Sequence, residues 1–227
     1  MARVYLIATD GDDIEKMCWS LFLQHDFPSY QTVWQNRVTP VTTRPAAMGF
    51  KSDAELAANG MDQHDMCFIQ LHYTVLVHLN VAYPYRAIRP LSAEDFTHAI
   101  VRLCSATDVA DELLGRVASP GTYDPWSEDR GRDARYAWRK THQQLQDVRN
   151  YRNHLIHGRI FMSVTDSMSG NIYFPKIGRE QKYIDWRSVA HSNPAAIMPD
   201  YASGHDILEE TWHRLVEYLE SNWKAIP

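Results

Sequence analysis

Apolar residues recur at every third or fourth position over several long stretches of the chain, which is the spacing of one face of an α-helix. In the first of these stretches, Leu71, Val75 and Leu79 share such a face. Ser92 is typical of a helix start, because its hydroxyl can accept a hydrogen bond from a first-turn amide and two acidic residues follow it. The predicted principal helices span about residues 61–83, 92–117, 133–157 and 207–223.

The spacing changes from helical to extended after residue 158. Ile160–Val164 and Ile172–Phe174 flank a turn at Ser169–Asn171 and predict a β-hairpin, which Tyr183–Trp186 can extend. Residues 193–204 are expected to form a loop. The hairpin is therefore an insertion before the last helix.

The first sixty residues show weaker patterns. We expect a short strand over Tyr5–Ala8, a helix over Ile14–Leu21, and an irregular or partly extended connection over residues 27–50, which contain three prolines. The predicted fold is mainly α, a bundle of four or five principal helices with the small hairpin insertion. We expect one domain over residues 1–227, with an irregular N-terminal region of about residues 1–60 packed on it.

The end of the third predicted helix combines residue types suited to phosphate chemistry. An arginine can bind two phosphate oxygens with its planar fork, and a histidine can exchange protons near neutral pH. Gly158 fits the left-handed position that ends a helix, which places His157 in the last turn. The segment is Arg149-Asn150-Tyr151-Arg152-Asn153-His154-Leu155-Ile156-His157-Gly158.

Arg152 and His157 are five positions apart, so they are offset by about 140° around a helix. Neither side chain then points at the other, and a site that uses both is better formed by two such helices packed together. Arg152 also shares a stripe with Leu145, Val148 and Leu155, where an arginine is costly unless it is paired or faces a cavity or a subunit interface. Arg149 and His154 have the same spacing, so two registers are open; the glycine after His157 favours Arg152 with His157.

The segment Arg152-Asn153-His154-Leu155-Ile156-His157 resembles the signature of the HEPN superfamily, in which an Arg is followed, after four to six residues that often begin with Asn, by a His near the end of a long helix. The resemblance implies a HEPN-like helical bundle and a metal-independent endoribonuclease that needs no cofactor. It implies a homodimer with a composite site in which Arg152, His157 and Asn153 are catalytic. It also implies a role as a toxin or phage-defence effector, with an antitoxin such as a nucleotidyltransferase. The alternative is a non-catalytic dimeric module that binds a nucleotide, RNA or a partner protein.

Positive charge is concentrated around this segment. Residues 130–159 hold eight basic and two acidic side chains, a net charge of +6, which leaves −11 for the rest of a chain whose net charge is −5. A basic helix on an acidic body can attract a polyanion to one face; the alternative is a solvated face paired with acids elsewhere. Aromatic residues at positions 136, 138 and 151 can stack on bases; the alternative is that they pack in the core or at an interface. The candidate RNA-binding residues are Arg149, His154, Arg135, Arg139, Lys140 and Arg159.

Other kinds of site have weak support. Cys18, Cys67 and Cys104 lack metal-type spacing and are expected to be buried free thiols in a reducing compartment, which favours a cytoplasmic location. The eleven histidines include no zinc motif, so no metal site is predicted. The most apolar stretch, Cys67–Tyr83, is interrupted by polar residues, so we expect a core helix and no membrane span.

Overall fold

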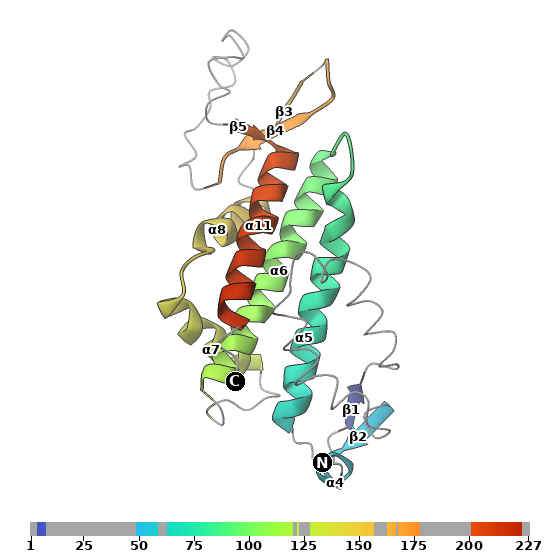
Figure 1. Ribbon diagram of the computed structural model, residues 1–227, viewed down its shortest axis with the longest axis vertical. Helices are drawn as coiled ribbons and strands as arrows, with labels where there is room; N and C mark the ends of the chain where they lie inside the picture. Colours follow the sequence, from blue (N-terminus) through green and yellow to red (C-terminus); the bar gives the residue numbers. More distant parts are fainter. Residues whose placement is uncertain are drawn as a thin grey trace. The chain divides into compact units, whose positions relative to one another are not determined.

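The computed structural model describes residues 4–7, 49–58, 63–119, 122, 128–156, 163–166, 168–177 and 201–223. Over these residues the chain is mainly helical, as the apolar spacing predicts, with short antiparallel strands (Figure 1). It forms two compact units. The first unit comprises Met1–Asn80, Ser105–Gln143 and Val216–Pro227, and the second comprises Val81–Cys104 and Gln144–Leu215. The expectation of one domain with residues 1–60 packed on it stays a prediction.

The described N-terminal elements are a two-stranded ribbon and a short helix. β1 (Val4–Ile7) pairs antiparallel with β2 (Gly49–Ser52), and α4 (Asp53–Ala58) follows directly. The strand expected over Tyr5–Ala8 is confirmed with its bounds one residue earlier. The helix expected over Ile14–Leu21 lies outside the described residues.

The first two long helices occupy the stretches that the apolar spacing predicts. They are α5 (Gln63–Ala82) and α6 (Ala93–Ala118), and the 3-10 turn η3 (Tyr83–Arg86) follows α5. The predicted cap of α6 is confirmed, because the Ser92 hydroxyl accepts a hydrogen bond of 3.0 Å from the amide of Asp95. None of the described helices is both long and apolar enough to cross a membrane.

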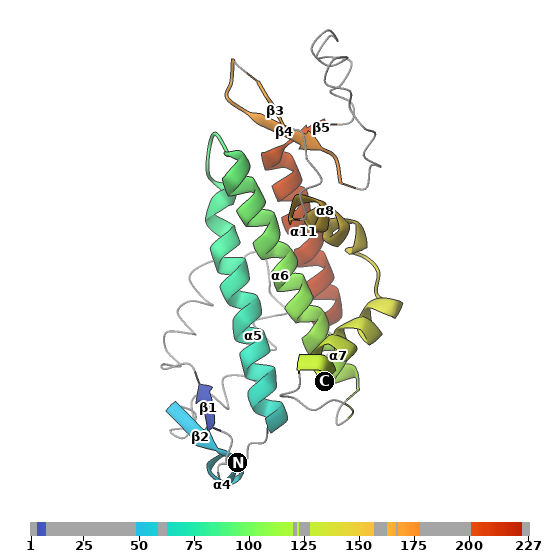
Figure 2. The same cartoon turned by 180° about the vertical axis from the view of Figure 1, so that it is seen from behind.

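In the first unit, α7 (Glu128–Thr141) packs closely on the C-terminal part of α6 (Figure 2). A Cβ added at Gly115 would lie 2.3 Å from the carbonyl oxygen of Ala134, so the two backbones meet where a side chain has no room. Ala134 is fully buried at this contact. The helix begins at Glu128, earlier than the expected start near residue 133.

A buried polar network holds the same helices together. The carboxylate of Asp111, which is fully buried, accepts hydrogen bonds of 2.6 Å from Arg139 Nε and 2.5 Å from the Tyr218 hydroxyl. Tyr218 lies on α11 (Gly204–Trp223) and accepts a 2.8 Å bond from the indole of Trp138. Arg139 also pairs with Asp108. A buried carboxylate is tolerated here because its oxygens have donors and a positive charge beside them.

In the second unit, aromatic rings fill the core beneath a small sheet. Phe96 stacks on Phe174 with ring centres 4.0 Å apart, and Tyr151 meets Phe96 edge to face at 6.4 Å. β4 (Ile172–Pro175) carries Phe174 and pairs antiparallel with both β3 (Val164–Thr165) and β5 (Tyr201–Ser203). The sheet lies at the start of α11 (Figure 1).

The predicted hairpin is confirmed at its turn and second strand, and the loop prediction is corrected. Of the first strand, expected over Ile160–Val164, residues 160–162 lie outside the described residues, and the observed strand is Val164–Thr165. Val164 pairs with Tyr173, and the turn contains Gly170 at a φ of 72°, a conformation that favours glycine. The expected loop over residues 193–204 is wrong at its end, because Tyr201–Ser203 pairs with β4 and Gly204 begins α11. A strand that joins a sheet from a distant part of the chain is not predicted by any local sequence pattern. The predicted extension at Tyr183–Trp186 lies outside the described residues.

The single helix expected over residues 133–157 is wrong. The structure has two helices there, α7 ending at Thr141 and α8 (Gln146–Ile156). Arg214 of α11 donates a 3.1 Å hydrogen bond to the carbonyl oxygen of Gln144, which lies in the break. A tertiary donor thus satisfies a backbone group that a continuous helix would have used, and neither glycine nor proline marks the position.

Candidate functional site

The last turns of α8 carry the described part of the predicted catalytic set. Arg152 Nε and Nη2 donate hydrogen bonds of 3.2 and 3.0 Å to Oδ1 of Asn153. Arg152 is half-buried and Asn153 is exposed, so this pair lies at the surface of the second unit. His157 lies outside the described residues, one position beyond the last residue of α8.

The two arginines of α8 differ sharply in exposure. Arg149 is only 3% exposed and lies between Val148 and Tyr151, which are also buried. Burial raises the pKa of the Tyr151 phenol, with a smaller contribution from Tyr201, and keeps it protonated. The sequence places Arg152 on the apolar stripe, but the more buried arginine is Arg149, three positions earlier in the same helix.

The apolar face of α8 is covered at its start and more open at its end. Leu145 and Val148 are 2% exposed, Leu155 is half-buried, and Ile156 is 51% exposed. The thiol of Cys104 donates to the carbonyl oxygen of Val148 at 3.6 Å, so the expectation of a buried free thiol is confirmed for this cysteine. The second half of α8 thus presents Arg152 beside an exposed apolar side chain.

An ion pair fixes the start of α8 on α11. Arg214 Nη1 and Nη2 donate hydrogen bonds of 3.0 and 2.8 Å to the two carboxylate oxygens of Asp147. Burial acts to raise the pKa of the Asp147 carboxyl, but the hydrogen bonds and charge of Arg214 outweigh it and hold this pKa below its usual range. The ionised carboxylate is also favourable at a helix N-terminus. The orientation of α8 is therefore set at its first turn.

The predicted RNA-binding residues of α7 have different surroundings. Arg139 is half-buried and pairs with Asp108 and Asp111. The alternative to RNA binding, in which the basic side chains pair with acids elsewhere in the fold, therefore applies to this arginine. Lys140 is exposed, and Arg135 is half-buried with its guanidinium carbon 5.8 Å from the ring centre of Tyr136. In α8, His154 is half-buried in the last turn. Arg159 lies outside the described residues.

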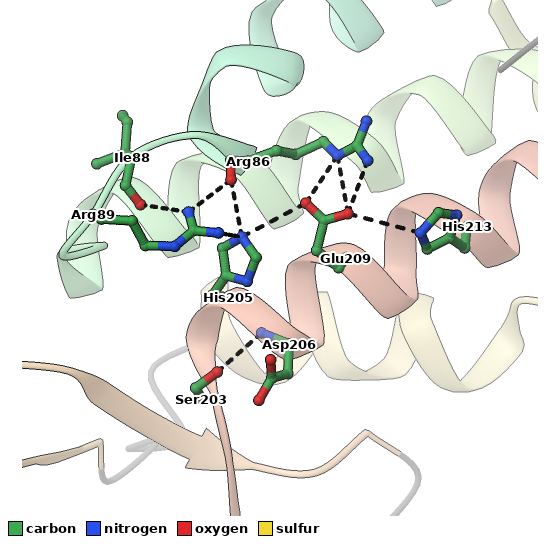
Figure 3. A network of polar contacts seen from close by, with 8 residues as sticks. All are labelled: Arg86, Ile88, Arg89, Ser203, His205, Asp206, Glu209 and His213. Carbon is green, nitrogen blue, oxygen red and sulfur yellow. Dashed lines mark hydrogen bonds and ion pairs between the residues drawn. The ribbon is translucent and has the colours of Figure 1, made fainter. Parts of the chain in front are cut away.

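A second polar cluster of the second unit joins η3 to α11 (Figure 3). Arg86 donates to both carboxylate oxygens of Glu209, with Nε 3.0 Å from Oε1 and Nη2 2.8 Å from Oε2, and its guanidinium carbon lies 4.7 Å from the ring centre of Trp212. Nε2 of His205 lies 3.7 Å, and Nε2 of His213 3.8 Å, from these oxygens. Arg86 thus binds both carboxylate oxygens of Glu209 and forms a clamp between η3 and α11. A carboxylate held in this way is poorly suited to exchange protons with a substrate.

Among the described residues, no group of three or more His, Cys, Asp or Glu side chains is arranged to hold a metal ion. Comparison of the chain with protein-family models, with curated proteins and with solved structures finds no match. The candidate site is therefore defined by its own residues and contacts. Its described part offers a guanidinium, held by an amide oxygen, at the end of a helix whose next residue is a histidine.

Proposed function

We propose that this chain is a metal-independent endoribonuclease of the HEPN type, which acts as a homodimer and uses Arg152 and His157 as catalytic residues. The pairing of Arg152 with Asn153 at the surface of α8, shortly before His157 in the chain, is the observation that carries the proposal. The resemblance of residues 152–157 to the HEPN signature supplies the reaction class. A toxin or phage-defence setting, with an antitoxin such as a nucleotidyltransferase, accompanies that resemblance.

The reaction rearranges one phosphodiester of RNA. The 2′-hydroxyl oxygen attacks the adjacent phosphorus and loses its proton to a base, while the bond from phosphorus to the 5′ oxygen breaks and that oxygen takes a proton from an acid. His157 transfers these protons, and the two copies in a dimer allow one imidazole to act as base and the other as acid. The products are a 2′,3′-cyclic phosphate and a 5′-hydroxyl. DNA lacks the attacking hydroxyl and is not cleaved.

Asn153 acts as a positioning residue for Arg152. Its Oδ1 receives hydrogen bonds from Nε and Nη2, which fixes the plane of the guanidinium. The edge formed by Nη1 and Nη2 then binds the phosphate and stabilises the negative charge that develops on its oxygens. Preorganisation of this kind is effective because the donors need not reorient during the reaction.

Differential burial supports the register that uses Arg152. A phosphate-binding arginine has to reach its ligand, and Arg149 is 3% exposed in the core of the second unit, whereas Arg152 is half-buried. The pair of Arg149 with His154 would therefore need a rearrangement of the buried face of α8. The pair of Arg152 with His157 uses the more accessible of the two arginines.

The exposed end of α8 supports the homodimer. Ile156 is 51% exposed next to half-buried Leu155, and these apolar side chains adjoin Arg152 on the same helix. Contact between two copies of this helix end buries apolar surface and brings His157 of one copy toward Arg152 of the other. Light scattering at micromolar concentration is expected to give the mass of a dimer, and a strict monomer would remove the composite site.

Cleavage of RNA in the presence of EDTA tests the reaction. Purified protein is incubated with a labelled single-stranded RNA and with the DNA of the same sequence. We expect RNA fragments that end in a 2′,3′-cyclic phosphate and intact DNA. Activity that EDTA abolishes would exclude the metal-independent mechanism, and RNA binding with no cleavage at all would leave the non-catalytic binding module.

A further inference from the structure

The basic segment, residues 130–159, contains three aromatic side chains, and the structure separates their roles. Trp138 donates its indole N–H to Tyr218 at 2.8 Å and stacks on His142, with ring centres 3.7 Å apart. Tyr151 is 5% exposed in the core of the second unit. Tyr136 on α7 is 53% exposed. Of the three rings, Tyr136 is therefore the one that a ligand can reach.

Basic side chains surround the exposed ring. The guanidinium of Arg135 lies 5.8 Å from the ring centre of Tyr136. Arg132 and Lys140, both exposed, lie one helical turn before and after it, about 6 Å away in each direction along the axis. Asp133 is exposed on the same helix and lowers the charge of this surface. Charge alone is thus weak here, and the ring has to contribute to any tight binding of a nucleic acid.

The inner side of α7 holds this surface in place. Ala134 packs against the backbone of Gly115, and Arg139 is bound to Asp108 and Asp111. Tyr136 is accordingly exposed on a helix that is anchored by backbone contact on its opposite side and by the ion pairs of Arg139. An exposed aromatic ring on an anchored helix binds a planar group with little loss of conformational entropy.

We propose that Tyr136 is a base-stacking residue of a single-stranded RNA-binding surface on α7, in which Arg132 and Lys140 contact the flanking phosphates. The combination of an aromatic face with nearby cations suits an unpaired base and its backbone, because every base has a face that stacks. A base-paired strand keeps its bases stacked on each other and cannot use the ring. The choice of RNA as ligand rests on the proposed function, but the surface does not require cleavage.

Binding of a fluorescein-labelled single-stranded RNA is measured by anisotropy in the His157→Ala background, so that the RNA stays intact. Tyr136→Ala is expected to weaken binding about 5- to 140-fold, the range for loss of one base–aromatic stack. Tyr136→Phe keeps the ring and is expected to bind as the parent does. Binding of a double-stranded RNA of the same length is expected to be unaffected by Tyr136→Ala. Equal binding by the Ala and Phe variants would overturn the stacking role.

The phosphate contacts are tested by salt dependence. Lys140→Gln is expected to reduce the slope of log affinity against log salt for single-stranded RNA by about 0.7, the value for one phosphate contact. Lys176→Gln removes the same charge from an exposed position of the second unit and is the matched control, with no change in slope expected. Equal slopes in the two variants would remove Lys140 from the surface.

The outcomes separate this inference from the proposed function. Cleavage by the wild type together with unchanged RNA affinity in Tyr136→Ala overturns the inference and leaves the nuclease intact. Tight single-stranded binding that depends on Tyr136, without cleavage, supports the inference and overturns the nuclease. Absence of RNA binding overturns both.

Discussion

Gly115 of α6 meets the backbone of Ala134 so closely that a Cβ at position 115 would lie 2.3 Å from the carbonyl oxygen of Ala134. Helix propensity alone makes Gly115→Ala stabilising by about 1 kcal/mol. The clash of the added Cβ with the carbonyl oxygen of Ala134 opposes this gain, because a backbone oxygen cannot rotate aside. We expect Gly115→Ala to lower the free energy of unfolding by about 1–3 kcal/mol, the range for overpacking, as measured by urea denaturation.

A second variant distinguishes a backbone clash from a side-chain clash. The atoms nearest to the added Cβ are backbone atoms of Ala134, so removal of the Ala134 side chain does not make room. The double variant Gly115→Ala/Ala134→Gly is therefore expected to be no more stable than Gly115→Ala. A stabilised Gly115→Ala protein would show that propensity decides and that α6 and α7 are not in backbone contact.

The ion pair at the start of α8 is expected to contribute modestly. The Asp147 side chain is 38% exposed, so solvent screens its attraction to Arg214. We expect Asp147→Asn to lower the free energy of unfolding by about 0.5–1 kcal/mol. Glu210→Gln is the control, because Glu210 also lies near Arg214 but at 4.0 Å and 61% exposed, and it is expected to have no measurable effect. An equal loss in both variants would mean that only the general charge of the region matters.

The clamp between η3 and α11 predicts acid sensitivity. Burial acts to raise the pKa of the Glu209 carboxyl, but Arg86, followed by His205 and His213, lowers it below its ordinary value. A carboxyl with a lowered pKa in the folded state stabilises the protein at pH above the ordinary value of about 4.3 and loses this contribution as the pH falls through the lowered pKa. The stability difference between wild type and Glu209→Gln is expected to be present while the carboxylate is ionised and to shrink below about pH 4. A difference that grows as the pH falls below about 4 would contradict the assignment.

Local patterns in the sequence predict the long helices and the hairpin. The features that the sequence does not predict depend on tertiary contacts. Ser92 before two acids and Gly170 in a turn act through their own backbone, so the start of α6 and the turn before β4 were predictable. The break between α7 and α8 depends on Arg214, seventy residues after the Gln144 carbonyl that it binds. Sequence spacing cannot show such a partner.

The site was predictable in composition but not in exposure. The motif residues and the basic segment are visible as residue types, yet Arg139 is bound to carboxylates of α6 and Arg149 is buried. Two of the candidate RNA contacts are therefore engaged within the fold, and Tyr136 stands out only when its 53% exposure is known. Arg86 and Glu209 are 123 positions apart in the chain, so no sequence motif predicts that cluster.

The contrast between the two arginines of α8 predicts opposite effects of their removal. Arg149→Ala removes a side chain that is 3% exposed and is expected to lower the free energy of unfolding by about 3 kcal/mol, at the upper end for a single substitution. Arg152→Ala removes a half-buried side chain and is expected to cost about 0.5–1 kcal/mol while reducing RNA cleavage. Urea denaturation and cleavage assays on both variants measure the two effects. A destabilised Arg152→Ala protein beside a stable Arg149→Ala protein would reverse the assignment.

The two histidines decide the register of the catalytic motif. If His157 transfers the protons, His157→Ala is expected to reduce RNA cleavage by about a hundred- to ten-thousand-fold, the range for general acid–base catalysis, without unfolding the protein. His154→Ala is the matched control, three positions earlier on the same segment, and is expected to be much milder. Cleavage rates are compared at equal folded concentration, checked by circular dichroism. An essential His154 with a dispensable His157 would select the register with Arg149, and it would require the buried guanidinium of Arg149 to move toward the substrate. Wild-type activity in both variants would assign the proton transfers to other groups and remove the HEPN mechanism.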